Sequence, residues 1–141
     1  MTPDRPLQVW LVDDSPTDRL LAEEAFAQVG ADCTLSTLAS GPDTLTALHT
    51  PGVALPSVLL LDLNMPGMNG LEVLSVLKAH HTFRYIPVIM LTTSQNEQDI
   101  QQAYQQRASA YVIKPVRFED FLQQVEGFVA FWSRAQLVTR R

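Results

Sequence analysis

The chain is poor in cysteine, in basic residues and in long apolar runs, and each shortage excludes a class of protein. Its one cysteine, Cys33, allows neither an internal disulfide nor a cysteine metal cluster. No apolar run approaches the length of a membrane-spanning helix, and the first residues lack the basic and apolar segments of a signal peptide. We therefore expect a cytoplasmic protein with no membrane partner. The net charge of −5 argues against nucleic-acid binding, which requires a basic surface.

The remaining composition is typical of one globular domain. The chain has 141 residues, of which 46% are hydrophobic and 18% charged. We expect a single domain over residues 1–141, with a core over about 7–129 and a C-terminal helical extension and tail over about 130–141. We expect no further domain within these residues, so that any downstream step would fall to another protein.

Short apolar runs alternate along the chain with segments of helical period. These patterns predict strands over 7–12, 33–38, 58–61, 86–91 and 111–113. Helices are predicted over about 16–29, 41–49, 71–80, 96–106 and 118–135. The run 58–61 has no polar alternation, which indicates that both faces of its strand are covered. Five strands each followed by a helix predict a doubly wound α/β fold with a parallel sheet.

Polar residues follow the predicted strands at equivalent places. Asp13 and Asp14 follow the first strand, Asp62 the third, Thr92 the fourth and Lys114 the fifth. Ligands of such sheets bind outside the carboxyl ends of the strands, so we expect these five side chains to meet at one edge. Each has a plainer explanation by itself, as a helix cap, a turn residue or a solvated lysine. Their joint occurrence favours a shared site.

Three neighbouring carboxylates repel one another unless a cation joins them, and oxygen ligands of this kind suit Mg²⁺, with Mn²⁺ as an alternative. An aspartate can also act as a nucleophile and form an acyl phosphate. Asp62 stands alone after the most apolar strand, so we predict that it is the phosphoacceptor. We predict Asp14 as a direct metal ligand and Asp13 as a ligand acting more through water. Lys114 and Thr92 would then stabilise the phosphoryl oxygens.

Four segments of the sequence resemble the receiver domain of response regulators, in the family's order: 12–15, 60–70, 86–92 and 111–115. The resemblance covers roughly residues 7–129. It implies a flavodoxin-like (βα)5 fold with strand order 2-1-3-4-5. It also implies a sensor histidine kinase that donates a phosphoryl group to Asp62 in a two-component phosphorelay. The chain would then be a signalling switch rather than an enzyme.

The same resemblance implies individual roles. Thr92 and Tyr111 would be switch residues that move on phosphorylation and change the face formed by the fourth helix, fifth strand and fifth helix. The peptide bond before Pro115 would be cis. The implied metal ligands are Asp13, Asp14, Asp62 and the backbone carbonyl of Asn64.

The sequence departs from the family at Arg107, where glycine usually ends the fourth helix in the left-handed conformation. Arg107 would either adopt that conformation at a cost of about 1 kcal/mol or require the helix to end differently.

A narrower resemblance links the chain to stand-alone regulators paired with bacterial phytochromes. It rests on residues 63–66 and 91–94 and on the late aromatics Phe128, Phe131 and Trp132. It implies a bacteriophytochrome kinase as partner and a homodimer built on the C-terminal face. Aromatics are enriched in protein interfaces, but these three could also simply cap the core.

Two other functions compete with the receiver. Haloacid-dehalogenase-like phosphatases also use aspartate, lysine, threonine and Mg²⁺, but their nucleophile opens a D-x-D pattern that is missing after the first strand, where Asp13 and Asp14 are adjacent. The second competing function is that of a binding module that kept the fold without being phosphorylated. The five intact site residues disfavour it.

Overall fold

A five-stranded parallel sheet forms the centre of the molecule, in the order β2-β1-β3-β4-β5. The computed structural model describes residues 6–30 and 33–135. The predicted fold class and strand order are confirmed. The strands are β1 (Leu7–Val12), β2 (Cys33–Leu38), β3 (Val58–Leu61), β4 (Val88–Thr92) and β5 (Ala110–Ile113). The helices are α1 (Pro16–Val29), α2 (Gly41–Leu48), α3 (Gly70–Ala79), α4 (Glu97–Gln105) and α5 (Phe118–Trp132).

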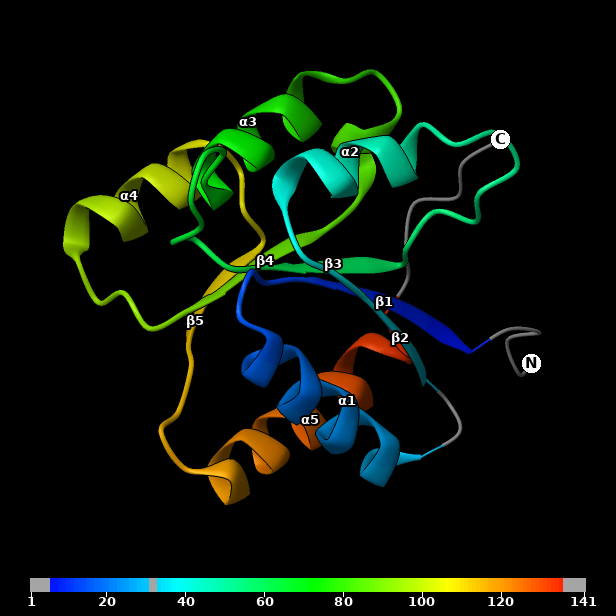
Figure 1. Cartoon of the computed structure of the whole chain (residues 1–141), viewed down its shortest axis with the longest axis vertical. Coiled ribbons are helices and arrows are strands. Elements are labelled where there is room, and N and C mark those ends of the chain that lie inside the picture. Colours follow the sequence, from blue (N-terminus) through cyan, green and yellow to red (C-terminus); the bar gives the residue numbers. More distant parts are fainter. Residues whose placement is uncertain (1–5, 31–32, 136–141) are drawn as a thin grey trace.

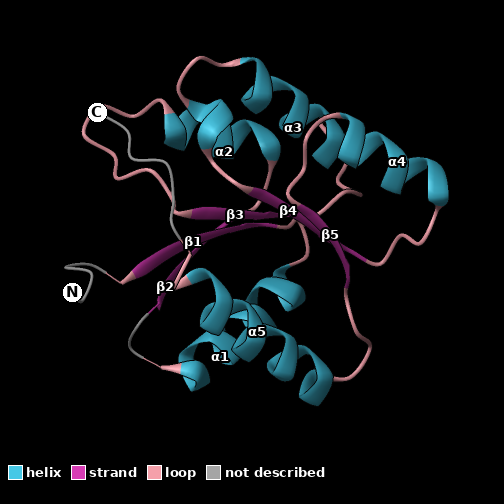
Figure 2. Ribbon diagram, turned by 180° about the vertical axis from the view of Figure 1, so that it is seen from behind, coloured by secondary structure: helices cyan, strands magenta, loops and turns pink. Residues whose placement is uncertain are grey.

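Helices cover the sheet on both faces, as Figures 1 and 2 show: α2, α3 and α4 lie on one side, and α1 and α5 on the other. Strand β3 has apolar side chains on both faces, and each layer of helices covers one of these faces. Leu59 and Leu61 belong to the core under α2–α4, whereas Val58 and Leu60 belong to the core under α1 and α5. All four residues are buried, so the predicted two-sided strand is confirmed.

The helices that flank the carboxyl edge of the sheet begin at well-defined caps. The Ser15 hydroxyl accepts a hydrogen bond from the backbone of Asp18 at the start of α1, and Pro16 occupies the first turn. Helix α3 begins with a reciprocal pair, in which Asn69 and Glu72 each accept from the other's backbone N–H. These caps set where α1 and α3 begin relative to the loops that follow β1 and β3.

Two local features differ from the sequence prediction or decide between its alternatives. A short 3₁₀ helix, η1 (Phe83–Tyr85), precedes β4, which begins at Val88 rather than residue 86. Arg107 has a φ of 69°, so it adopts the left-handed conformation and ends α4 as a glycine would.

The expectation of a cis bond before Pro115 is wrong for this structure, since no peptide bond among the described residues is cis. Trans is the preferred isomer of such bonds by roughly 0.5–1 kcal/mol, a margin that sequence alone does not resolve. Within residues 6–30 and 33–135, none of the helices has both the length and the apolar character needed to span a bilayer.

Candidate functional site

The predicted polar residues meet at the carboxyl edge of the sheet. Asp13 and Asp14 follow β1, Asp62 follows β3, Thr92 ends β4 and Lys114 follows β5. One carboxylate oxygen from each of the three aspartates lies within 4.8 Å of the others. Asp13 and Asp62 are buried, whereas Asp14 is exposed.

Backbone hydrogen bonds hold the buried aspartates in place. The Asp62 N–H donates to the Val12 carbonyl at 2.9 Å, which ties Asp62 to the end of β1. The Asp13 N–H donates to the Leu38 carbonyl at 3.0 Å. The Arg19 guanidinium donates to the Asp13 carbonyl at 2.7 Å, and the Ser15 N–H donates to Asp13 Oδ1 at 2.9 Å. The first turn of α1 therefore fixes Asp13 from two directions.

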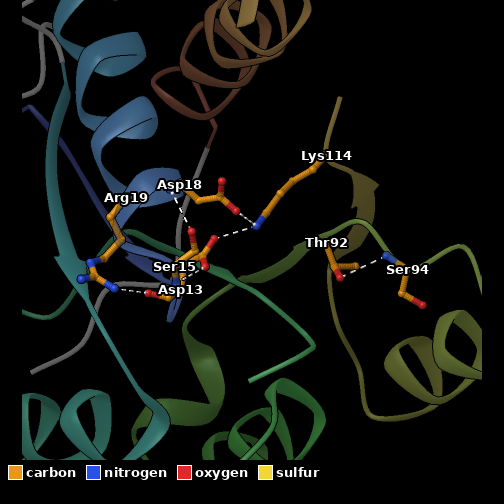
Figure 3. Close-up of polar contacts among 7 residues, drawn as sticks. All are labelled: Asp13, Ser15, Asp18, Arg19, Thr92, Ser94 and Lys114. Carbon is orange, nitrogen blue, oxygen red and sulfur yellow. Dashed lines mark hydrogen bonds and ion pairs between the residues drawn. The ribbon is translucent and has the colours of Figure 1, made fainter. Parts of the chain in front are cut away.

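Lys114 reaches across the site toward α1, as Figure 3 shows. Its Nζ lies 2.7 Å from Asp13 Oδ2 and 2.9 Å from Asp18 Oδ2. Burial acts to lower the pKa of Lys114, but the hydrogen bonds to these two carboxylates and the negative charges of Asp62 and Asp13 together outweigh it, and the pKa lies above its usual value. Lys114 is therefore held as a cation beside the acidic cluster.

Sequence reasoning did not single out Asp18 or Arg19. Both stand in the first turn of a predicted amphipathic helix, where charged residues are ordinarily solvated or interact with the helix dipole. The only signal for Asp18 was its place three residues after the Ser15 cap, where a carboxylate usually completes the cap. No pattern in the sequence links Asp18 to a lysine 96 residues later.

Burial raises the pKa of Asp62 from 3.8 to about 6. The Lys114 ammonium and the Thr92 hydroxyl lower this pKa, and the neighbouring Asp13 carboxylate raises it. The raised pKa indicates that Lys114 and Thr92 do not fully offset the cost of burying the Asp62 carboxylate. The buried oxygen donors fit a hard divalent cation, which would remove this electrostatic cost.

Thr92 and Tyr111 are joined through the loop after β4. Thr92 is fully buried, and its hydroxyl accepts a hydrogen bond from the Ser94 N–H at 3.2 Å. The Tyr111 hydroxyl donates to the Ser94 carbonyl at 2.9 Å, and the Ser94 hydroxyl donates to Asp99 Oδ2 at 2.7 Å. This loop thus connects the site to β5 and to the first turn of α4.

Gly70 is a second residue that sequence reasoning missed as part of the site. A Cβ atom at this position would overlap the Asp62 carbonyl oxygen and would lie 2.9 Å from Leu63 Cα. Only glycine lets the start of α3 pack this closely against the backbone of Asp62. A glycine that opens a predicted helix was the available signal, but it also fits an ordinary loop.

The other predicted residues lie outside this cluster. Asn64 is exposed in the loop after Asp62. On α5, Phe128 and Trp132 are half-buried and Phe131 is 65% exposed. They border an apolar groove of about 540 Å³ between α5 and β5, which Phe121 and Val112 also line. Residues 136–141 of the predicted tail lie outside the described part of the chain.

Comparisons with known proteins agree with this geometry. Residues 9–126 match the family model described as "Response regulator receiver domain". The probable methanogenesis regulatory protein FilR2 of Methanothrix harundinacea is 36% identical over 130 residues, 90% of this chain and 84% of that protein. The response regulator Rcp1 of Synechocystis sp. PCC 6803 is 34% identical over 131 residues, 90% of this chain and 89% of Rcp1.

Solved structures show the same relationship. The phosphorylated cyanobacterial phytochrome response regulator RcpA has a TM-score of 0.88 and 32% identity, covering 95% of this chain and 99% of that chain. The Mn²⁺-bound form of Rcp1 has a TM-score of 0.85 and 32% identity, covering 95% and 100%. The bacteriophytochrome response regulator AtBRR has a TM-score of 0.72 and 33% identity, covering 98% and 100%. The chain therefore belongs to the response regulator receiver domain family of signalling switches, and it is close to Rcp1, RcpA and the bacteriophytochrome response regulators.

Proposed function

We propose that the protein is a single-domain response regulator that accepts a phosphoryl group from a sensor histidine kinase on Asp62. The observation that carries the proposal is the position of this carboxylate. Asp62 is buried at the carboxyl edge of the sheet, where an oxygen of its carboxylate lies within 4.8 Å of oxygens from Asp13 and Asp14. Lys114 and Thr92 border the same cluster and influence the pKa of Asp62.

The proposed reaction is a transfer between two side chains. An oxygen of Asp62 forms a bond to phosphorus while the phosphorus–nitrogen bond of the kinase phosphohistidine breaks, and the imidazole nitrogen keeps the bonding electron pair. Lys114 supplies a fixed positive charge for one phosphoryl oxygen, and the Thr92 hydroxyl supplies a hydrogen-bond donor for another. The backbone contacts of Asp62 hold its carboxylate toward the incoming group.

We propose Mg²⁺, or Mn²⁺ in its place, as the metal of this site, held by Asp13, Asp14, Asp62 and the backbone carbonyl of Asn64. The ion would neutralise the cluster and the charge on the transferred group. Two observations support this: the mutual proximity of the three carboxylates and the raised pKa of Asp62. Rcp1 is known in a Mn²⁺-bound form.

The rim of the site is apolar enough to receive a protein donor. Leu21 on α1 is 42% exposed and Val116 is fully exposed, and both line the same hollow as Asp18 and Lys114. Exposed apolar residues beside a reactive group are typical of protein docking surfaces. We propose that the kinase docks over this rim and that both proteins are cytoplasmic. The similarity to RcpA and AtBRR supports a bacteriophytochrome as that kinase.

We further propose that phosphorylation shifts the loop that joins Thr92, Ser94 and Tyr111. A phosphoryl group that draws the Thr92 hydroxyl toward Asp62 would weaken its contact with the Ser94 N–H. Because Ser94 also bonds to Tyr111 and Asp99, the change would reach β5 and α4. The output surface would be the face formed by α4, β5 and α5.

The test is phosphorylation by acetyl phosphate with Mg²⁺, read by intact mass. We expect the wild type to gain one phosphoryl mass, and we expect no gain for Asp62→Asn or when the metal is removed by a chelator. The matched control is Asp43→Asn, which removes an exposed carboxylate at the start of α2 and should behave as wild type. A wild type that gains no mass from acetyl phosphate or from a cognate kinase would refute the proposal in favour of an unphosphorylated binding module. Turnover of a generic phosphate ester would favour a phosphohydrolase.

We also propose a homodimer formed through the C-terminal face. The exposed Phe131 and the half-buried Trp132 border the apolar groove beside β5, and such aromatics are enriched in interfaces. Light scattering should give twice the chain mass for the wild type and the monomer mass for Phe131→Lys. Val76→Lys is the matched control, because Val76 is an exposed apolar residue on α3, on the opposite face of the sheet. A monomeric wild type at all concentrations would refute this assembly.

A further inference from the structure

The first turn of α1 uses its acidic residue differently from the first turn of α3. In α3, the carboxylate of Glu72, the third helical residue, accepts a hydrogen bond from the N–H of the Asn69 cap at 2.9 Å. Asp18 occupies the same position in α1, three residues after its Ser15 cap. The Ser15 N–H instead donates to Asp13 Oδ1 at 2.9 Å. The carboxylate of Asp18 is thus released from the capping role.

The released carboxylate binds Lys114 instead. Asp18 Oδ2 lies 2.9 Å from the Lys114 Nζ, and Asp13 Oδ2 lies 2.7 Å from it on the same side (Figure 3). An ammonium group has three N–H donors, and two of them point to the α1 side of the site. Among the described residues, the hydrogen bonds of this ammonium go to Asp13 and Asp18 and not to Asp62.

The two carboxylates differ in what else they can bind. Asp13 is 1% exposed and belongs to the cluster of three carboxylates that fits a divalent cation. Asp18 is 39% exposed and is not a member of that cluster. A cation bound by the cluster would share the charge of Asp13, whereas Asp18 would keep its full attraction for Lys114. Asp18 is therefore the residue that can hold Lys114 on the α1 side when the site is loaded.

We propose that Asp18 is a positioning residue that retains the Lys114 ammonium beside α1 and competes with the phosphoryl oxygen for it. This inference rests on the proposed function, in which Lys114 must serve the group transferred to Asp62. The strength of the competition would set how readily the site takes up a phosphodonor. Loss of the Asp18 carboxylate leaves Lys114 with one carboxylate hydrogen bond among the described residues, to Asp13, so that a second of its three N–H donors becomes free for the phosphoryl group.

The test is the rate of phosphorylation as a function of acetyl phosphate concentration, with Mg²⁺ in excess. In this reaction a phosphorus–oxygen bond forms to Asp62, the phosphorus–oxygen bond to acetate breaks, and acetate leaves with the electron pair. We expect Asp18→Asn to reach its half-maximal rate at a roughly two- to fivefold lower concentration, the range set by a partly exposed ion pair. Asp18→Glu keeps the carboxylate and should stay close to wild type.

Two further variants separate this role from a general charge effect. Asp43→Asn removes the carboxylate at the same position of α2, where Ser40 is the cap, and should leave the concentration dependence unchanged. Lys114→Met should itself lower the rate of phosphorylation. Adding Asp18→Asn to Lys114→Met should not change the acetyl phosphate concentration that gives the half-maximal rate. The inference would be overturned if Asp18→Asn lowered the half-maximal concentration equally in the Lys114→Met protein, or if Asp43→Asn lowered it. It would also be overturned if Asp18→Asn raised that concentration.

The failure of the inference and that of the proposed function give different results. A wild type that is phosphorylated as strongly as Asp18→Asn at every concentration would refute the role of Asp18 alone. A wild type that is not phosphorylated at all would refute the proposed function, and the inference with it.

Discussion

Replacing Asp62 by asparagine should stabilise the metal-free protein at neutral pH, because its buried carboxylate is held at an energetic cost. The asparagine side chain has nearly the same shape but carries no charge. At about 1.4 kcal/mol for each pH unit, a rise in the pKa from 3.8 to about 6 corresponds to about 3 kcal/mol. We expect the free energy of unfolding of Asp62→Asn to exceed that of wild type by up to this amount at pH 7.5.

The sign of the pH dependence follows from proton binding. The folded state holds the Asp62 proton more tightly than the unfolded chain does, since the folded pKa is the higher one. The free energy of unfolding of the wild type therefore falls as the pH rises from about 4 to about 6 and stays at the lower value above that range. The advantage of Asp62→Asn should be full above pH 6 and should shrink as the pH is lowered toward 4.

The assay is urea unfolding followed by tryptophan fluorescence, in the presence of a chelator, at several pH values between 4.5 and 7.5. Trp10 is a suitable probe because it is buried in the core under α2–α4. When Mg²⁺ replaces the chelator, it should stabilise the wild type more than Asp62→Asn, because it binds the intact carboxylate cluster. The difference in the free energy of unfolding between the two proteins should then become smaller. Equal stabilities of the two proteins at pH 7.5 without metal, or a difference that does not change with pH, would refute the reasoning.

Three further predictions concern backbone positions. Gly70→Ala should lower the free energy of unfolding by about 1–3 kcal/mol and slow phosphorylation, since its Cβ would overlap the backbone of Asp62. Gly127 is an exposed residue inside α5, and a Cβ added there meets no atom within 4 Å, so Gly127→Ala should raise the free energy of unfolding by about 0.5–1 kcal/mol. Urea unfolding of both variants measures these two changes. Changes of the same sign and size would contradict the reasoning. Arg107→Gly should raise the free energy of unfolding by about 1 kcal/mol, because Arg107 has a φ of 69°, which glycine adopts without strain. An unchanged or lower urea midpoint would show that Arg107 is not strained.

The proposed site was largely foreseeable because its residues come directly after strands. In a parallel sheet all the carboxyl ends lie at one edge, so residues that follow different strands must converge. Asp13, Asp62, Thr92 and Lys114 are brought together for this reason alone. The two-sided burial of β3 followed likewise from its uninterrupted apolar run. These features depend on local pattern and on topology, which the sequence expresses directly.

Other features depended on distances that no local pattern encodes. The contact of Lys114 with Asp18 joins positions 96 residues apart, and the Ser15 N–H donates to the Asp13 carboxylate rather than to that of Asp18. The need for glycine at position 70 arises from the approach of α3 to the Asp62 backbone.

The sequence by itself thus determined the fold class, the strand order through its resemblance to a family, and which residues gather at the edge of the sheet. The tertiary structure alone decided which carboxylates hold the ammonium of Lys114, which glycine the packing requires, and that the bond before Pro115 is trans. The physical reason is that convergence at an edge follows from chain connectivity. The choice among neighbouring partners turns on differences of about 1 kcal/mol, which only the assembled environment sets.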